Sequence, residues 1–396
     1  MPSLFKLAAL LAVLLTPVHA GAADIRIVPA DFVVLNSTNP DKGYSDLLIH
    51  TIAIATGANE NATLTSLRVE ILSKGRRVLT REVSPEEMTA GTQFLAGAPI
   101  REFVTGQLLN ARGLDGLFGR PVAFANSSTM APSRALLVTR LHFSVGFKPD
   151  EVRVVATLTG AKGEQTILAS VAVRSYTSPI AYRSPLAGQW LMNAVPGVQS
   201  HHRFNPSTEF AVDFFKLGPD GHMVHGDKLD ARNFYGFGAP VMAATDGTVV
   251  AVISDQVQDR SALVRKPGEP LDSFYTRVEE LHMAGMKKNF RAANAGNLVT
   301  IRHEKDGVVE YSSYGHLRTG SVRVRSGDHV VQGQIIGEVG DTGDSAAVHL
   351  HFQVNGGPDP FISKSLPVVF SNLGSVEGND ELGRLVTTAA GEDIAF

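Results

Sequence analysis

Two histidines near the end of the chain, His349 and His351, are separated by one residue within an alternating polar and apolar pattern. Side chains on an extended strand repeat every two residues, so both imidazoles share one face with Gln353. The opposite face carries four apolar residues: Val348, Leu350, Phe352 and Val354. Imidazole nitrogens bind metals and exchange protons near neutral pH. An isolated pair of this kind favours a sheet edge with solvated histidines, so any chemistry depends on partners elsewhere in the chain.

Candidate partners lie upstream. Asp213 falls in a strand pattern, residues 210–215, on the face opposite its aromatic and apolar neighbours. A buried carboxylate without a partner is costly, so Asp213 is either solvated at a sheet edge or neutralised by a cation. His201 and His202 precede it on a polar loop, near enough along the chain to reach the same site. His316 ends an extended run, where a side chain can face a cleft.

The elements that must position these residues are predominantly strands. In the second half, residues 238–253 read as a hairpin around Asp246-Gly247, and residues 297–303, 308–317 and 327–340 read as further strands. Two longer connections interrupt them, residues 217–237 and 256–294. In the second, apolar residues recur at helical spacing between charged ones, which predicts an amphipathic helix packed on the domain surface, with a lid over a nearby groove as the alternative.

The first half also reads as short strands, separated by turn residues and arranged as an antiparallel sandwich. The expected strands span residues 31–35, 46–55, 63–72, 136–145, 151–158 and 166–173. Short helices or loops are expected at 85–89 and 94–114. His50 and His142 each stand alone in a strand pattern, which favours hydrogen-bonded structural histidines. The segment 177–188, rich in Pro, Ser and Gly, is the expected interdomain connection.

Composition limits the class of protein. The 396 residues suggest two domains, and 36 basic against 39 acidic residues give a net charge of −3, with no argument for nucleic-acid binding. Residues 1–20 have the pattern of a secretory signal peptide, with cleavage expected after Ala20 or as late as Ala23. The sequence therefore predicts an exported protein, periplasmic or secreted, that is not stably inserted in a membrane after cleavage. There is no cysteine, so disulfides and lipid attachment are excluded.

From about Trp190 to Phe370 the chain resembles the lysostaphin or LytM-type zinc metallopeptidase family. The matching motifs are Ala211-Val-Asp213-Phe, the 238–249 hairpin segment, Tyr314-Gly-His316-Leu317, the glycine-punctuated 327–337 segment and His349-Leu-His351-Phe. The resemblance implies a mostly β fold, in which a β-sandwich-like domain (24–182) precedes an antiparallel β metallopeptidase domain (183–375) with insertions 217–237 and 256–294. A C-terminal tail, residues 376–396, would follow.

The resemblance also implies one Zn²⁺ per chain, held by His202, Asp213 and His351, with an open position for water. His316 and His349 would serve as general base or as stabilisers of the tetrahedral intermediate, in either order. The familiar family pattern places its first histidine four residues before the aspartate, and Glu209 occupies that position here. His202, beside Arg203, resembles a variant with the histidine farther upstream. His201 and then Glu209 are the alternatives for the first ligand.

This reading predicts an exported zinc endopeptidase, with peptidoglycan cross-links as the substrate that the resemblance implies. The alternative is a catalytically inactive LytM-like protein that binds or activates another cell-wall hydrolase. A third reading, cleavage of another exported protein or peptide, would use the long insertions to reshape the groove.

Overall fold

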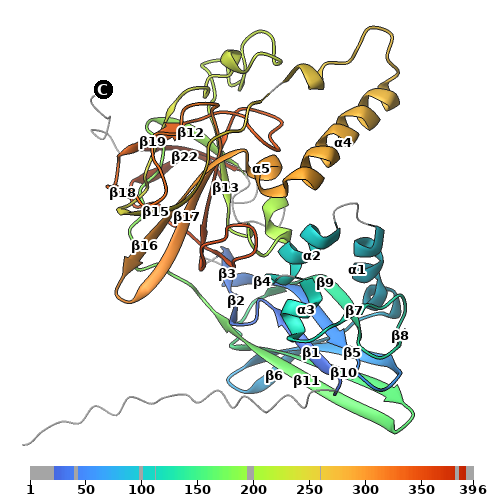
Figure 1. Cartoon of the computed structure of the whole chain (residues 1–396). Coiled ribbons are helices and arrows are strands. Elements are labelled where there is room, and N and C mark those ends of the chain that lie inside the picture. Colours follow the sequence, from blue (N-terminus) through green and yellow to red (C-terminus); the bar gives the residue numbers. More distant parts are fainter. Residues whose placement is uncertain are drawn as a thin grey trace, which may run out of the picture.

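The computed structural model describes residues 22–39, 43–97, 101–111, 113–193, 200–258, 260–379 and 383–388. The predicted signal peptide, residues 1–20, lies outside this part of the chain. Strands dominate, as the sequence predicts, and they form an N-terminal and a C-terminal body that lie against each other (Figure 1). Within the described ranges, no helix has both the length and the apolar character needed to cross a membrane.

The N-terminal body contains two sheets. The first comprises β1 (Asp24–Val28), β3 (Asn36–Asn39), β4 (Tyr44–Ala55), β7 (Ala123–Phe124) and β9 (Arg134–Val145). The second comprises β2 (Phe32–Val34), β5 (Ala62–Ser73), β6 (Arg76–Glu82), β8 (Thr129–Met130), β10 (Glu151–Gly160) and β11 (Gly163–Arg174). Apolar side chains from both sheets form one buried cluster between them. The sandwich is not wholly antiparallel as expected, because β2–β11 and β7–β9 pair in parallel.

Three helices, α1 (Pro85–Gly97), α2 (Arg101–Leu109) and α3 (Gly113–Phe118), join this body where the sequence predicts short helices or loops. The first begins with a capping box: the backbone N–H of Glu87 donates to Ser84 Oγ, and the N–H of Ser84 donates to Glu87 Oε2. Leu95 and Leu108 pack on alanines of β4 and β9 in a separate buried cluster, so the helices cover one part of the first sheet.

The C-terminal body is built on one large sheet in the order β18-β15-β16-β17-β20-β13-β12-β23-β22, with β21 beside β20. Its strands are β12 (Gln189–Asn193), β13 (Val212–Phe215), β15 (Gly247–Ile253), β16 (Asn297–Lys305), β17 (Val308–Leu317), β18 (His329–Val330), β20 (Leu350–Asn355), β21 (Ser365–Leu366), β22 (Leu373–Asn379) and β23 (Gly383–Thr388). A second pair consists of β14 (Pro240–Met242) and β19 (Ile335–Glu338). Residues 383–388, which the sequence analysis assigns to a tail, form β23 and pair with β12.

The insertions contain helices. They are the 3₁₀ turns η3 (Ala231–Asn233) and η4 (Arg260–Leu263) and the helices α4 (Leu271–Lys288) and α5 (Phe290–Ala295); a further turn, η2 (His201–Phe204), precedes β13. Helix α4 forms where the apolar spacing predicts it, but it projects away from the sheet (Figure 1). Leu271, Tyr275 and Leu281 remain about half exposed, and Met286 is its one buried residue.

The two bodies are joined through buried polar contacts. Glu310 of β17 is fully buried and accepts hydrogen bonds from three hydroxyl groups of the connecting segment, those of Tyr176, Ser178 and Tyr182. Near the other side of the interface, Lys364 Nζ donates to the Phe32 carbonyl oxygen at 2.6 Å. Because buried carboxylates are costly without donors, the connection is fixed where it leaves the N-terminal body.

Candidate metal centre

The register of the three central strands of the large sheet brings the predicted residues together. Strand β20 lies between β13 and β17, and His351 is directly opposite Asp213 on one side and Gly315 on the other. His316 follows Gly315 with a left-handed backbone (φ 59°), a conformation that is uncommon for a residue with a side chain. The apolar face of β20 is at most 2 % exposed, as the alternation predicts, and it anchors the strand in the core.

Asp213 is the centre of the cluster, and it is only 4 % exposed. Its Oδ2 lies 3.1 Å from His202 Nε2, and its Oδ1 lies 3.1 Å from His351 Nδ1. His201 Nε2 is farther from Oδ2, at 3.6 Å, and this side chain is 69 % exposed. The ligand atoms of His201, His202 and Asp213 lie within 4.8 Å of one another, while His351 approaches the second oxygen of the carboxylate.

Hydrogen bonds fix the orientation of the His351 ring. Its Nε2 lies 2.7 Å from Gln353 Oε1. The Gln353 amide nitrogen donates to Ser207 O, Asn355 Oδ1 and Pro360 O, so the amide oxygen must be the atom that faces the ring. Nε2 of His351 therefore carries a proton, which leaves Nδ1 as the nitrogen available to a metal ion.

His316 and His349 present the opposite nitrogen. His316 Nδ1 lies 2.8 Å from the Thr342 carbonyl oxygen, and His349 Nδ1 lies 2.8 Å from the Ala347 carbonyl oxygen. A carbonyl can only accept, so both Nδ1 atoms donate and both Nε2 atoms are free to accept a proton. The rings lie 4.6 Å apart between centroids, and His349 also stacks on Phe215 at 4.9 Å.

The loop between β19 and β20 supplies both carbonyl groups, and close backbone packing holds it. Gly343 has a left-handed backbone (φ 81°), and a Cβ there would lie 2.3 Å from the backbone nitrogen of Gly296. At the start of the loop, Asp341 accepts a 2.7 Å hydrogen bond from Arg260, which also donates to the Ala346 carbonyl oxygen. Both charged groups are buried. The sequence analysis did not identify Arg260, because nothing in its local pattern indicates a partner 81 residues away.

Burial and neighbouring charge set the protonation states. Burial lowers the pKa of His202 to about 4, and it also lowers the pKa values of His316 and His349. Burial alone would raise the pKa of Asp213, but the adjacent His202 and His349 outweigh it and hold that pKa well below its usual range. Burial likewise opposes the charge on His351, yet its hydrogen bond to Asp213 gives a net raised pKa. The centre thus holds an anionic carboxylate among mostly neutral imidazoles.

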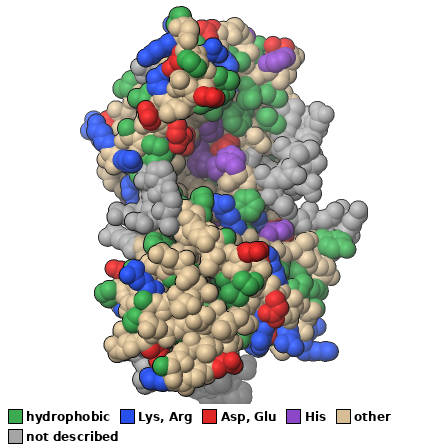
Figure 2. Space-filling model, turned by 90° about the vertical axis from the view of Figure 1, so that its right-hand side faces the viewer, with side chains coloured by type: hydrophobic (Ala, Val, Ile, Leu, Met, Phe, Trp, Pro, Cys, Tyr) green, Lys and Arg blue, Asp and Glu red, His purple; other side chains and the backbone are tan. Residues whose placement is uncertain are grey.

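These residues line a cavity of about 480 Å³. Figure 2 shows histidine side chains gathered in a hollow near the middle of the visible face. Asn294 and Ala295 of α5 contribute to the wall, as does Gln107 of α2 in the N-terminal body, whereas α4 does not. The cavity is therefore bordered by both bodies of the molecule, and the segment expected as a possible lid contributes only its short second helix.

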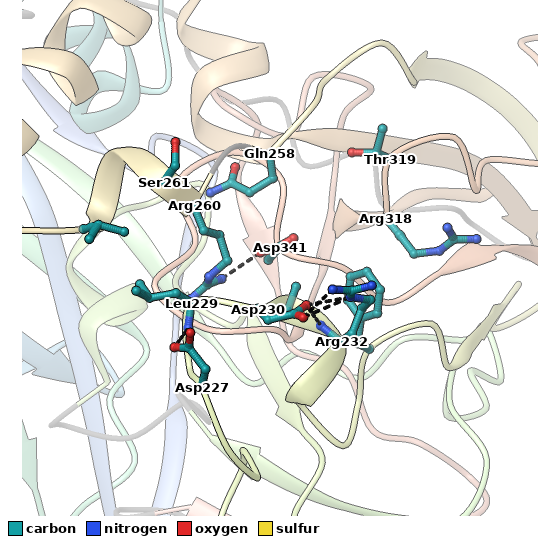
Figure 3. Close-up of a pocket in the computed structure, with 13 residues that line it drawn as sticks. Asp227, Leu229, Asp230, Arg232, Gln258, Arg260, Ser261, Arg318, Thr319 and Asp341 are labelled. Carbon is teal, nitrogen blue, oxygen red and sulfur yellow. Dashed lines mark hydrogen bonds and ion pairs between the residues drawn. The ribbon is translucent and has the colours of Figure 1, made fainter.

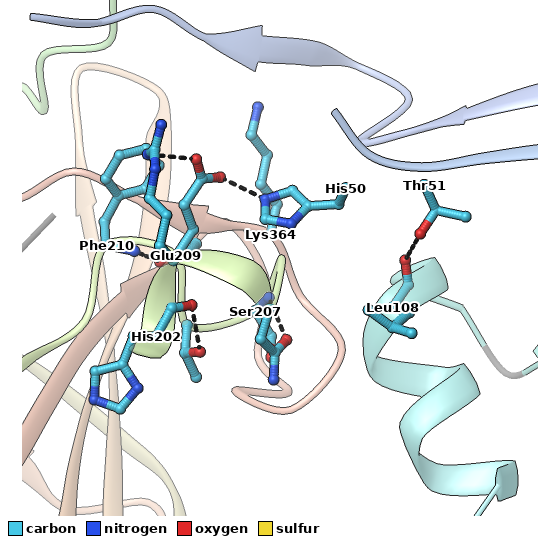
Figure 4. Close-up of polar contacts among 12 residues, drawn as sticks. His50, Thr51, Leu108, His202, Ser207, Glu209, Phe210 and Lys364 are labelled. Carbon is cyan, nitrogen blue, oxygen red and sulfur yellow. Dashed lines mark hydrogen bonds and ion pairs between the residues drawn. The ribbon is translucent and has the colours of Figure 1, made fainter. Parts of the chain in front are cut away.

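Glu209, the last alternative for the first ligand, lies outside this cluster. Its carboxylate accepts a hydrogen bond from Arg203 at 2.8 Å and lies 2.9 Å from His50 Nε2. Figure 4 shows Glu209 turned toward His50, while the His202 ring points away on the opposite side of the same segment. Glu209 thus belongs to the interface between the two bodies. Its carboxylate is buried there, and the ion pair with Arg203 compensates its charge.

A second pocket, of about 640 Å³, lies beside the Asp341 loop (Figure 3). Its arginines are already paired: Arg260 with Asp341, Arg232 with Asp230, and Arg318 with Glu338 at the rim. Asp227, also in the lining, accepts a hydrogen bond from the Leu229 N–H. Because the cations are compensated locally, this pocket offers no concentrated charge of either sign. The pocket contains the Arg260–Asp341 ion pair, which restrains the loop.

The donor set of the first cluster fits a zinc ion. A buried anionic carboxylate has imidazole nitrogens at both of its oxygens, and the His202 ring is neutral and so keeps a lone pair. Nitrogen and carboxylate ligands of this kind, three in number with further space beside them, are typical of catalytic zinc sites. His202, Asp213 and His351 would hold the ion, with His201 as the nearby alternative.

One segment of the chain matches a known protein family. Residues 282–361 match the model of Peptidase family M23. Among solved structures, the chain is similar to the catalytic domain of lysostaphin from Staphylococcus simulans (21 % identity, 48 % of this chain and 88 % of that chain, TM-score 0.23). It is also similar to a zinc containing peptidase from Vibrio cholerae (16 % identity, 81 % and 82 %, TM-score 0.25). A putative peptidase M23 from Pseudomonas aeruginosa gives 14 % identity over 76 % and 89 %, with a TM-score of 0.26.

Because these TM-scores are low, the family assignment rests on the matched sequence segment. That segment includes three of the histidines that line the cavity, His316, His349 and His351. Residues 282–361 thus resemble Peptidase family M23.

Proposed function

We propose that the protein is an exported zinc metalloendopeptidase that hydrolyses peptide cross-links of bacterial peptidoglycan. The observation that carries the proposal is the arrangement around Asp213, where two histidines contact the carboxylate and two others, His316 and His349, keep Nε2 free within the same cavity. The substrate class and export follow from the family resemblance and the signal-peptide pattern at residues 1–20.

In this mechanism His202, Asp213 and His351 would hold one zinc ion, which when bound would polarise the scissile carbonyl and make a water molecule more acidic. His316 and His349 are the two groups able to take the proton of the attacking water, since burial favours their neutral forms and Nε2 is the free nitrogen. The ring that accepts the proton becomes an imidazolium, which can donate from Nε2 to the reacting oxygen and then return the proton to the leaving amine.

The test combines metal analysis with digestion of purified sacculi. We expect one zinc per chain and release of peptide fragments identified by mass spectrometry. Asp213→Ala, which removes the carboxylate shared by both histidines, is expected to bind no zinc and release nothing. Wild-type protein that binds zinc but leaves sacculi intact would favour the inactive, partner-binding alternative, and cleavage of a peptide library in preference to sacculi would favour another exported protein as substrate.

A further inference from the structure

The interface between the two bodies contains a buried cluster of charged residues beside the metal centre. Arg203 is fully buried, and its guanidinium pairs with Glu209 at 2.8 Å and with Asp46 of β4. His50, also on β4 and fully buried, contacts the other oxygen of Glu209 at 2.9 Å. Asp46 and His50 come from the N-terminal sheet. Arg203 and Glu209 lie between the proposed ligands His202 and Asp213 in the sequence.

The order of residues along the chain connects this cluster with the proposed ligands. Arg203 directly follows His202, and Glu209 lies four residues before Asp213. Two of the three proposed ligands, His202 and Asp213, therefore have on their own short segment a charged residue bound to the N-terminal sheet. Figure 4 shows His202 and the Glu209 carboxylate on opposite sides of this segment. A displacement of Arg203 or Glu209 would move one ligand relative to the other.

The segment has local hydrogen bonds of its own, among them those of the Arg203 N–H to the Ser200 carbonyl oxygen, the Asn205 N–H to the His202 carbonyl oxygen and the Thr208 N–H to the Asn205 carbonyl oxygen. Within it, η2 (His201–Phe204) is a single 3₁₀ turn. Such a turn is marginal alone. By contrast, a buried guanidinium with two carboxylates has a narrow range of acceptable geometry, because any loss of contact leaves a charge without compensation.

The N-terminal sheet completes the support of η2 from the other side. The Arg140 guanidinium of β9 lies over the Phe204 ring at 5.6 Å, and His142 Nε2 lies 3.3 Å from the Asp46 oxygen that binds Arg203. β4 and β9 are adjacent strands, so one rigid surface presents these groups together. Phe204, the last residue of the 3₁₀ turn, and Arg203, the residue after His202, are thus both held by the same sheet.

We propose that Asp46 and His50 are positioning residues of the metal centre, which hold His202 against Asp213 through Arg203 and Glu209. The N-terminal domain is then part of the machinery that assembles the site. The expected effect on zinc affinity rests on the proposed function. The positioning itself rests on the contacts at the interface.

The test uses the full-length chain and four variants that are confirmed to be folded by circular dichroism. Asp46→Asn removes the charge that binds Arg203, and His50→Leu removes the donor to Glu209. His50→Gln keeps a donor and serves as the conservative rescue. Thr51→Val is the matched control: Thr51 lies on the same strand, but its hydroxyl donates to the Leu108 carbonyl oxygen within the N-terminal domain (Figure 4).

Three readouts are needed. In metal-free protein, we expect amide hydrogen exchange across residues 201–213 to become at least about tenfold faster in Asp46→Asn and His50→Leu. In chelator competition, the same variants should bind zinc about 10–100-fold more weakly, as is usual when the partners that orient ligands are removed. The cobalt-substituted forms should show an altered visible spectrum, and His50→Gln and Thr51→Val should match the wild type in all three measurements.

The outcomes separate the two proposals. Unchanged exchange and unchanged zinc affinity in Asp46→Asn and His50→Leu would overturn the positioning role while leaving the zinc peptidase intact. Equal weakening by Thr51→Val would also overturn it, because general destabilisation of the domain would then account for the effect. If wild-type protein binds no zinc, the proposed function fails, and the exchange measurement still decides whether the cluster orders η2.

Discussion

At the scale of single residues, three histidines of the cavity fall into two groups according to which ring nitrogen is already hydrogen-bonded. His351 uses Nε2 on Gln353 and turns Nδ1 to Asp213, whereas His316 and His349 use Nδ1 on backbone carbonyl oxygens and keep Nε2 free. His349, just before β20, and His351, within it, therefore present different ring nitrogens to the cavity.

This division predicts different effects of substitution. His351→Ala should abolish zinc binding. His349→Ala and His316→Ala should keep zinc but lower kcat by about 10²–10⁴-fold, the usual contribution of a positioned acid or base. Zinc content and kcat measured on the same preparations check the prediction, and His222→Ala, on an exposed loop, is the control. Loss of zinc from His349→Ala would assign that residue to the ligands instead.

A buried histidine outside the cavity predicts a pH dependence of stability. His303 of β16 contacts the Asp246 carbonyl oxygen and Ser312 Oγ, both at 2.7 Å, and burial lowers its pKa to about 4 from the ordinary 6.5. The folded state favours the neutral ring, so the stabilisation present above pH 6.5 is lost as the pH falls toward 4. Between pH 7.5 and pH 5 this amounts to about 2 kcal/mol.

Urea unfolding of metal-free protein at the two pH values measures this effect. His303→Gln should be less stable at pH 7.5, yet its free energy of unfolding should change less with pH than that of the wild type. An identical pH dependence in both proteins would contradict the assignment.

The histidines and the aspartate that the structure brings together in the cavity were visible in the sequence, whereas the residues that support them were not. Alternation identified the face shared by His349 and His351, and the strand pattern around Asp213 placed its carboxylate on the face opposite the apolar residues. Arg260 and His50 gave no such signal, because their partners lie 81 and 159 residues away. Glu209 was considered as a ligand from its spacing alone, and only tertiary contacts show that its carboxylate is engaged elsewhere.

At the scale of elements, the loop from Asp341 to His349 determines the orientation of both Nε2-free histidines. Thr342 and Ala347 provide the two carbonyl oxygens. The buried Arg260–Asp341 pair holds the start of this loop. Arg260 belongs to η4, in the long insertion between β15 and β16. The insertion therefore contributes to the site through one side chain and a short helix, α5, rather than through its longer helix.

Removing the arginine should show this dependence. Arg260→Ala leaves Asp341 buried without its cation, so we expect a loss of about 3–5 kcal/mol in the free energy of unfolding. It should also lower kcat more than it raises KM, because the loop positions catalytic side chains. In the double variant Arg260→Met/Asp341→Leu stability should largely return while kcat stays low. Full recovery of kcat in that variant would contradict a positioning role for the pair.

Among the elements, the long strands of the N-terminal body were predictable, whereas the C-terminal strand β23 was not. β4, β5, β9 and β10 appear within a few residues of their expected limits, because each carries a continuous buried face. β23 has one cationic and several polar positions and gains its place by pairing with β12, a long-range contact. Helix α4 was correctly expected from its spacing, but its packing was not, since periodicity does not show what a face packs against.

At the scale of the whole molecule, the two bodies meet through charges and hydroxyl groups as well as apolar contact. Arg203 reaches Asp46 across 157 residues of sequence, and Lys364 reaches Asp31 across 333. The length of the chain predicts two domains, with residues 177–188 as their connection, and the hydrogen bonds of Tyr176, Ser178 and Tyr182 to Glu310 fix the chain to β17 at this point.

Those three hydroxyl groups determine how short a stable fragment of the C-terminal body can be made. A fragment that begins at residue 183 leaves the buried Glu310 carboxylate without any of its three donors, whereas one that begins at residue 175 keeps them all. We expect the shorter fragment to melt at lower temperature, with Glu310→Leu restoring part of the difference, because an apolar side chain needs no donors there. We therefore expect the smallest stable unit that contains β17 to begin before β12, the first strand of the C-terminal body.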